Sequence, residues 1–248
     1  MKYSVLLFCV LLFWGCEIDK VTDCFQAEGK SISSKIDVPH FDKVLIYENV
    51  KVFIEKGPVQ EVIVKTGENL LDNVQVSVEE KTLILKNESS CNLFRDYKLV
   101  EIYVTSPNIT EIRNAGQWIV ESVNTLTFPN LTLLTENFNN KDFHTNGGFR
   151  LQLDCEELKI TSNGFSIYFL SGKVEHMFAG FYASDGRLEA SDLIVQKLEF
   201  FHRSSNKLIV NPQQSLKGEI RSTGDVISKN HPPIVEVEEF YTGRLIFP

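Results

Sequence analysis

Apolar and polar residues alternate along the first half of the chain in short runs that end at Gly, Asn or Pro. The alternation is clearest in "KVLIYENVKVFIEKG", "EVIVKTG", "NVQVSVEEKTLILKN" and "LVEIYVTSP". It is typical of strands with one buried face, because successive side chains point to opposite sides of a sheet. The region from Ile36 to Pro107 is therefore predicted to form strands and hairpins compatible with antiparallel pairing. Only "GENLLDNV" indicates a helical turn.

Beyond Pro107 the alternation acquires a repeat of about 20 residues. Each copy has a hydroxyl residue or Asn at a reference position, an Ile, Leu, Tyr or His two positions earlier, and a Gly or Asn two positions later. The reference positions are Asn114, Thr135, Ser162, Ser184, Ser204 and Ser222. Such a period is typical of a solenoid, in which each coil buries its apolar face on its neighbours. We predict an all-β fold: a β-solenoid (β-helix-like) with coils of about 20 residues, preceded by an N-terminal stranded segment continuous with it.

The repeat also predicts which side chains point into a coil. Alternate residues share one face of a strand, so the reference residues are predicted to lie inward together with the apolar column. The residues two positions later, among them Gly164 and Gly224, are predicted to form corners with positive φ. His202 stands in the apolar column and is predicted to be a satisfied core histidine.

The N-terminus has the layout of a secretory signal peptide. One cation, Lys2, precedes an apolar run that ends at Gly15-Cys16. A small residue directly before Cys resembles the bacterial lipoprotein signal, in which Cys16 is lipidated and residues 1–15 are removed. The alternative is an ordinary signal peptide with a chance Cys. Glu17 and Asp19 resemble the acidic export signal of Bacteroidetes-type surface lipoproteins, which predicts an outer-membrane protein facing outward, or alternatively the periplasm.

Composition limits the partners of the mature chain. The 248 residues have a formal net charge of −8 and a pI near 5.2, so no basic stripe is available for nucleic acid. An anionic lipid surface would not attract such a protein electrostatically, and the predicted membrane contact is the acyl anchor at Cys16. We expect a lipidated tether at residues 16–34 and a single β domain at 35–248, divided into N-terminal strands at 35–107 and solenoid coils at 108–248.

Cysteine and histidine positions bear on disulfides and metals. Cys24 and Cys91 lie in polar, turn-rich contexts and can form a disulfide in an oxidising compartment. Cys155 lies within an alternating strand pattern and is predicted to be a buried thiol. The sequence has no Cys-x-x-Cys pair, and its five His are scattered, so neither a metal site nor another cofactor is predicted.

The alternating front half, the "STGDVIS" corner and the C-terminal "PPIVEVEEFYTGRLIF" together resemble the head GIN domain family. The resemblance covers Lys35 to Pro248. Members of the family are labelled auto-transporter adhesins and are common as exported proteins of Bacteroidetes. The resemblance implies a β-solenoid and a cell-surface setting, and it supplies no catalytic or binding residues. "NAGQW" departs from the Gly-rich family pattern, so that coil is expected to bend differently.

Two pairs of residues are candidates for surface binding. Phe181 and Phe201 are predicted to occupy one outward column on neighbouring coils, where aromatic rings can stack on sugars or dock a partner chain. The alternative is that a loop covers them. Arg203 and Arg221 are predicted to share another outward column, either as a cationic strip that faces acidic sugars or as a solvated pair.

These features favour a non-enzymatic surface or envelope protein that binds glycans, a matrix component or another envelope protein. One alternative is a polysaccharide-active enzyme on the same scaffold, which would use clustered carboxylates as an acid and base pair or around Ca²⁺. The carboxylates considered are Asp185, Glu189, Asp192, Glu219 and Asp225. A further alternative is a structural subunit that stacks end to end with other solenoids. No catalytic residue is assigned, because fold analogy alone is a weak argument for function.

Overall fold

The structure is a computed structural model that describes residues 29–88 and 100–248. Within these residues, 18 strands form one continuous sheet, accompanied by one short 3-10 helix, η1 (Glu68–Asn73). The predicted all-β class is therefore confirmed. The predicted signal peptide, the anchor Cys16 and the cysteine pair Cys24 and Cys91 lie outside the described residues.

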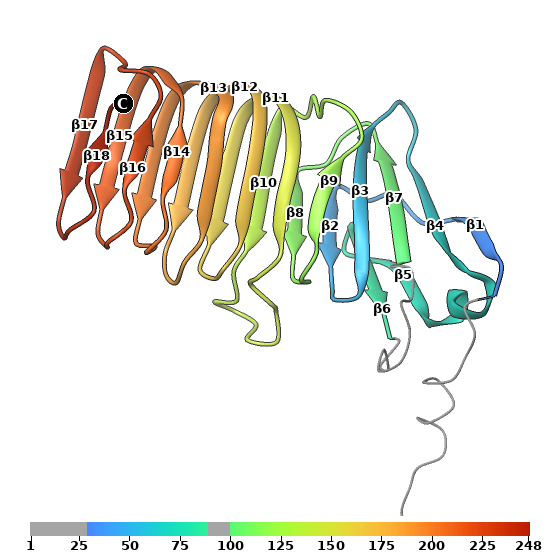
Figure 1. Cartoon of the computed structure of the whole chain (residues 1–248). Helices are drawn as coiled ribbons and strands as arrows, with labels where there is room; N and C mark the ends of the chain where they lie inside the picture. Colours follow the sequence, from blue (N-terminus) through green and yellow to red (C-terminus); the bar gives the residue numbers. More distant parts are fainter. Residues whose placement is uncertain (1–28, 89–99) are drawn as a thin grey trace, which may run out of the picture.

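The sheet folds into two walls that face each other across the core (Figure 1). Three long strands bend and contribute to both walls: β11 (Gly148–Ser162), β12 (Ile167–Phe181) and β13 (Arg187–His202). Wall one also contains β5 (Val74–Glu79), β6 (Thr82–Asn87), β2 (Lys43–Ile46), β8 (Glu111–Asn114), β10 (Asn130–Thr135), β15 (Pro212–Ile220) and β17 (Ile234–Glu239). Wall two also contains β1 (Ser31–Ile36), β4 (Glu61–Gly67), β7 (Val100–Ser106), β3 (Val50–Lys56), β9 (Ile119–Ser122), β14 (Leu208–Val210), β16 (Val226–Ser228) and β18 (Leu245–Ile246).

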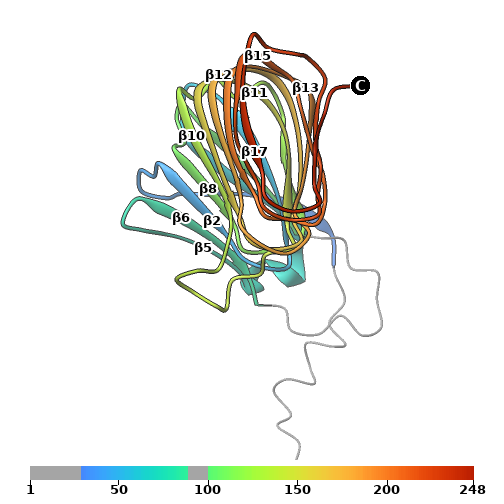
Figure 2. The same ribbon diagram turned by 90° about the vertical axis from the view of Figure 1, so that its left-hand side faces the viewer.

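Strands stack in parallel from β8 to the C-terminal end of both walls. Hydrogen-bonded partners lie 27 to 29 residues apart in sequence where β10 and β9 pair with β11, and about 20 apart beyond β11. One inward column of wall one joins Leu133, Ile160, Ala179, Phe200, Gly218 and Val237. Viewed along the stack, the walls form a nearly closed, barrel-like sheet (Figure 2). Because side chains alternate along each strand, one set of residues fills the interior and the other covers the outside.

Large apolar side chains fill the space between the walls. Phe149 and Tyr168 are fully buried and stack with ring centroids 5.3 Å apart. Phe181 packs edge-on against Tyr168 at 5.6 Å. The Tyr168 hydroxyl lies 2.7 Å from Thr135 Oγ1, which also lies 2.7 Å from Ser166 Oγ. This hydroxyl network satisfies polar groups that burial would otherwise leave without partners.

The N-terminal end of the stack has a different pairing from the rest. β4 pairs antiparallel with β1 and β7, and β5 pairs antiparallel with β6. In contrast, β2 and β3 pair only in parallel and belong to the same stack as the later coils. The prediction of hairpins and antiparallel pairing for 36–107 is therefore wrong for these two strands, because alternation does not distinguish the two pairings. The predicted helical turn is confirmed as η1, and β1 begins at Ser31, before the predicted domain boundary at residue 35.

The predicted inward column of polar reference residues is correct only as far as Ser162. Asn114, Thr135 and Ser162 are buried on successive strands. The residue opposite Ser162 is Phe181, which is followed in the same column by His202 and Ile220. Ser204 is buried as predicted, but Ser184 is exposed, with φ +62°, and Ser222 is half-buried. The strand partner of Ser162, Phe181, is closer in sequence than Ser184, so the serines do not stay in register.

The repeated glycines serve close packing rather than positive φ. In the described chain the glycines with positive φ are Gly29, Gly172 and Gly218, so the prediction for Gly164 and Gly224 is wrong. A Cβ at Gly224 would overlap the carbonyl oxygen of Asn206 in the preceding turn and lie 2.6 Å from His202 Nε2. Successive turns thus stack too closely for a side chain at this corner.

Candidate functional site

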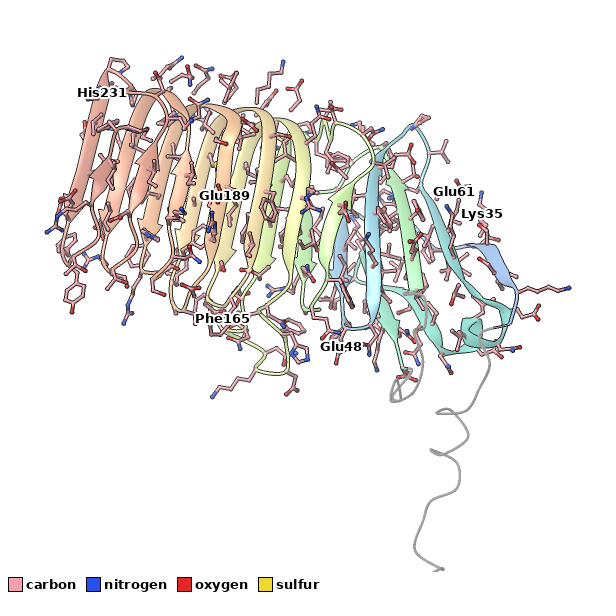
Figure 3. The ribbon with its side chains drawn as sticks, in the orientation of Figure 1. Lys35, Glu48, Glu61, Phe165, Glu189 and His231 are labelled. Atoms are coloured by element: carbon pink, nitrogen blue, oxygen red, sulfur yellow. The ribbon has the colours of Figure 1, made fainter. Side chains whose placement is uncertain are left out.

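One edge of the molecule is lined by the turns in which wall one passes into wall two. We call it the turn edge, and it lies at the bottom of Figure 1, where the loop between β10 and β11 protrudes. Large aromatic side chains are exposed in these turns: Trp118, Phe138, Phe165, Phe240 and Tyr241. Phe165 is 65% exposed and points away from the ribbon beside that loop (Figure 3). Exposed aromatic side chains that gather along one edge of a domain can mark a binding site.

Five side chains on the wall-one side of this edge contact one another in sequence, and we call them the aromatic row: Phe138, Tyr182, Phe201, Arg221 and Phe240. Phe138 packs edge-on against Tyr182, with ring centroids 5.8 Å apart. Tyr182 stacks on Phe201 at 5.1 Å. The rings therefore form a continuous row of mutually packed side chains that crosses neighbouring strands.

Arg221 joins the two aromatic parts of the row. Its guanidinium carbon lies 3.9 Å from the centroid of the Phe240 ring and 5.9 Å from that of Phe201, both within the range of a cation–π contact. Its Nε donates a hydrogen bond to the Glu219 carboxylate, which raises the pKa of Arg221. The guanidinium is thus held in place by a carboxylate and by two aromatic rings.

Shallow hollows lie beside the row on wall one. One is lined by Phe138, Lys159, Thr161, Phe178 and Tyr182. Lys159 and Phe178 also line a wider depression that extends across β10 to β15 and contains Lys197 and Lys217. Lys159 and Lys197 are exposed and make no ion pair within residues 29–88 and 100–248, whereas Lys217 Nζ lies 2.8 Å from Glu236 Oε2.

The structure separates the predicted aromatic pair. Phe201 lies on the outside, but Phe181 is fully buried and contacts Tyr168, so it does not belong to the surface. The prediction placed Ser162 opposite Ser184, whereas Phe181 is its partner. A slip of one residue moves a side chain to the other face of a sheet. The position expected for Phe181 is therefore occupied by Tyr182.

The predicted arginine column is present. The Arg203 amide donates to the Phe181 carbonyl and the Arg221 amide donates to the His202 carbonyl, each at 2.7 Å. Because Phe181 and His202 are partners, the two arginines occupy equivalent outward positions on neighbouring strands. Arg203 is exposed and makes no ion pair or side-chain hydrogen bond in the described part of the chain. Sequence reasoning missed Phe138 and Phe240, whose loop positions show no repeat.

The predicted core histidine is buried but not satisfied. His202 is fully buried, and neither ring nitrogen has a hydrogen-bond partner. Burial lowers the pKa of His202 to about 4, and backbone groups of Asn206 and Gly224 together with the Asp225 carboxylate oppose that shift only partly. The histidine is therefore neutral at physiological pH.

The carboxylates considered for catalysis are dispersed, and most are engaged in local contacts. Glu189, on the outside of wall two (Figure 3), forms a salt bridge with Arg187. Asp185 accepts hydrogen bonds from Ser205 Oγ and the Asn206 amide. The remaining positions are Asp192, exposed on wall two, Glu219, bonded to Arg221, and Asp225, bonded to the Arg244 amide. No group of three metal-ligating side chains gathers anywhere in the described residues.

Cys155 is a free, buried thiol, as predicted, and burial raises its pKa to about 11. A thiol with such a pKa is a poor nucleophile at neutral pH. Among the helical residues that the structure describes, none forms a helix long and apolar enough to cross a lipid bilayer.

Comparisons with known proteins found a matching family and several solved structures of similar fold. Residues 40–232 match the family model described as "Putative auto-transporter adhesin, head GIN domain". A crystal structure of a "putative adhesin" from Bacteroides fragilis superposes with a TM-score of 0.77 and 22% identity, covering 88% of this chain and 97% of that chain. A "putative adhesin" from Parabacteroides merdae gives 0.59 and 13%, covering 89% and 100%. A "putative lipid binding protein" from Parabacteroides distasonis gives 0.60 and 14%, covering 88% and 97%. Comparison with curated proteins found no match.

Proposed function

The chain belongs to the family described as "Putative auto-transporter adhesin, head GIN domain", and on this premise we propose that it is a non-enzymatic surface adhesin that binds carbohydrate through the aromatic row. The contact series from Phe138 through Tyr182 and Phe201 to Arg221 and Phe240 is the observation on which the proposal rests. Exposed aromatic side chains bury apolar surface of a sugar ring, and neighbouring polar groups bind its hydroxyls. Phe201 lies in β13 and Tyr182 directly follows β12, so little ordering of these two rings is needed on binding.

Two observations support a non-enzymatic role. On wall two, Glu121 and Glu189 share one outward column but are separated by Arg150 and Phe169, which corresponds to three strand spacings, or about 14 Å. Glycosidase carboxyl pairs lie closer, about 5 to 9.5 Å apart. A general acid and a general base must be free to contact the substrate. Three carboxylates near the turn edge instead accept hydrogen bonds from the protein itself: Asp185, Glu219 and Asp225.

We further propose that the parallel stack is a β-solenoid with coils of about 20 residues. The pairing of Ile160 with Ala179, and of Ala179 with Phe200, supports this description. An elongated stack presents successive side chains at one strand spacing, which suits a ligand that is itself a repeating chain.

The proposed location is the outer membrane, with the protein anchored by acyl chains on Cys16 and facing outward. The support is the Gly15-Cys16 signal, the acidic residues that follow it and the adhesin description of the family. A Cys16→Ala variant should lose radiolabelled palmitate and move from the detergent phase to the aqueous phase. Retained palmitate in that variant would contradict the lipid anchor.

A structural subunit that stacks end to end remains the second candidate. In the described chain, β17 and β18 each pair with one neighbour only, and Ile234 and Ile246 are exposed on them. Unpaired strand edges can template association between chains. Sedimentation of the purified protein decides between the candidates, because stacking predicts concentration-dependent polymers and the adhesin proposal predicts none.

The binding proposal is tested by screening the purified chain on a glycan array, followed by titration of the glycans that bind. The double variant Tyr182→Ala/Phe201→Ala should bind at least about tenfold more weakly. Each contact between a sugar ring and an aromatic side chain contributes on the order of 1 kcal/mol to the binding free energy. The matched control is Phe53→Ala, which removes a ring stacked at 4.7 Å on Tyr103 on the outside of wall two. Equal binding by wild type and double variant would refute the proposed site.

A further inference from the structure

The aromatic row and the arginine column lie side by side, and this arrangement bears on the charge of the ligand. We infer that the site takes a linear acidic polysaccharide that lies along the stack and places its carboxylate groups against Arg203 and Arg221. The inference rests on the proposed function and adds the chemical class of the glycan.

The direction of the ligand follows from the backbone. Ser162, Phe181, His202 and Ile220 form one inward column, and their carbonyls accept hydrogen bonds from the backbone amides of Tyr182, Arg203, Arg221 and Phe240. The four side chains therefore occupy one outward column on four successive strands. Neighbouring strands lie about 4.8 Å apart, so the column extends over about 14 Å. An occupant that touches both Tyr182 and Phe240 must be extended along the stack axis.

The order of side chains within the column sets the chemistry. An aromatic residue stands at each end, and two guanidinium groups stand between them. Arg203 has no acidic partner in the described part of the chain, so its planar donors are free to form a bidentate contact with a carboxylate. Glu219 occupies only the Nε of Arg221, which leaves the terminal nitrogens of that guanidinium available.

Neighbouring charges restrict how the ligand lies. Lys159, which lines the hollow at Tyr182, adds a third exposed cation, and like Arg203 it makes no ion pair in the described residues. Glu219 and Glu238 occupy the next outward column, two residues before Arg221 and Phe240. The chain as a whole has a net charge of −8. A polyanion is therefore attracted only where its acid groups meet the cations, and it is repelled elsewhere on the surface.

The test compares acidic polymers with their own neutral forms. Affinity of the purified chain is measured for polygalacturonate, alginate and hyaluronan, and for the same polymers after reduction of their carboxyl groups to alcohols. We expect at least one acidic polymer to bind about tenfold more tightly than its reduced form, because each charge-assisted hydrogen bond contributes a substantial share of the affinity. The preference should weaken as salt is raised.

Variants assign the preference to the arginines. Arg203→Gln/Arg221→Gln should lower binding of the acidic polymer to the level of its reduced form. The control Arg150→Gln, an exposed arginine over the Phe169 ring at 5.0 Å on wall two, should change nothing. The inference is overturned if none of the three acidic polymers binds, if reduced and acidic forms bind equally, or if the double variant keeps the preference. Those results leave the proposed adhesin intact as long as Tyr182→Ala/Phe201→Ala abolishes binding of a neutral glycan on the array.

Discussion

Replacing His202 by Leu should remove an acid sensitivity that is built into the core. The imidazole lies between Phe181 and Ile220 in one inward column, fully buried and without a hydrogen-bond partner at either nitrogen. An unfolded chain protonates this side chain near pH 6.5, whereas burial in the folded protein lowers its pKa to about 4. The unfolded state therefore binds the proton more tightly than the native state.

The sign and size of the effect follow from this difference. Stability conferred by a neutral His202 is fully present above about pH 6.5 and is lost as the pH falls toward the folded pKa of about 4. One pKa unit corresponds to about 1.4 kcal/mol, so the full loss is roughly 3 kcal/mol. About 2 kcal/mol of it should appear between pH 7.5 and pH 5. Leu is similar in volume, cannot be protonated and leaves no polar atom unpaired, so at neutral pH the variant should be at least as stable as the wild type.

Urea unfolding at both pH values, followed by intrinsic fluorescence, measures this difference. Carboxylates contribute to the pH dependence of both proteins, so the informative quantity is the wild-type loss minus the variant loss. His176→Gln serves as the control, because it removes an exposed imidazole from the outside of wall one. If His202→Leu loses as much free energy of unfolding between the two pH values as the wild type does, the argument from burial is incorrect.

Further substitutions test the close approach of neighbouring turns and the buried hydroxyl network. Gly224→Val should lower the free energy of unfolding by about 1 to 3 kcal/mol, because the new side chain would overlap the carbonyl of Asn206. Thr223→Val, at an exposed position, should change it by no more than about 0.5 kcal/mol, as measured by thermal unfolding. Equal melting temperatures for these two variants would contradict the close approach of the turns. Tyr168→Phe should cost about 1 to 2 kcal/mol, because Thr135 Oγ1 loses one of its two partners in the buried hydroxyl network and keeps only Ser166 Oγ. With Thr135→Val added, the total loss should be less than the sum of the two single changes. Additive losses would show that the two hydroxyls are not coupled.

The sequence by itself determined the class of the fold and much of its interior. Alternation identifies the buried face of a strand without knowledge of its neighbours, because the side-chain period is a local property of the backbone. For this reason Leu133 and Ile160 were correctly placed inward, and Asn114, Thr135 and Ser162 were correctly aligned. The same local pattern identified Arg203 and Arg221 as outward neighbours.

Register beyond Ser162 was decided only by the tertiary structure. The pairing of Ser162 with Phe181, and the irregularity between Phe169 and Ser171 on the next strand, depend on hydrogen bonds between residues far apart in sequence. A spacing counted from serine to serine does not contain that information. A slip of one residue exchanges the inside and the outside of a strand, so Phe181 is part of the core and Tyr182 is part of the surface.

The candidate site also depends on the tertiary structure. Phe138 reaches Tyr182 from a loop without a repeat, and Phe240 reaches Arg221 from the last turn of the stack. Their local sequences give no reason to pair them with the residues they contact, because those contacts arise from the order in which coils stack. Sequence alternation determines which side chains can be exposed on each strand. Only the stacking of the strands determines which exposed side chains meet, since that depends on coil length and non-local hydrogen bonding.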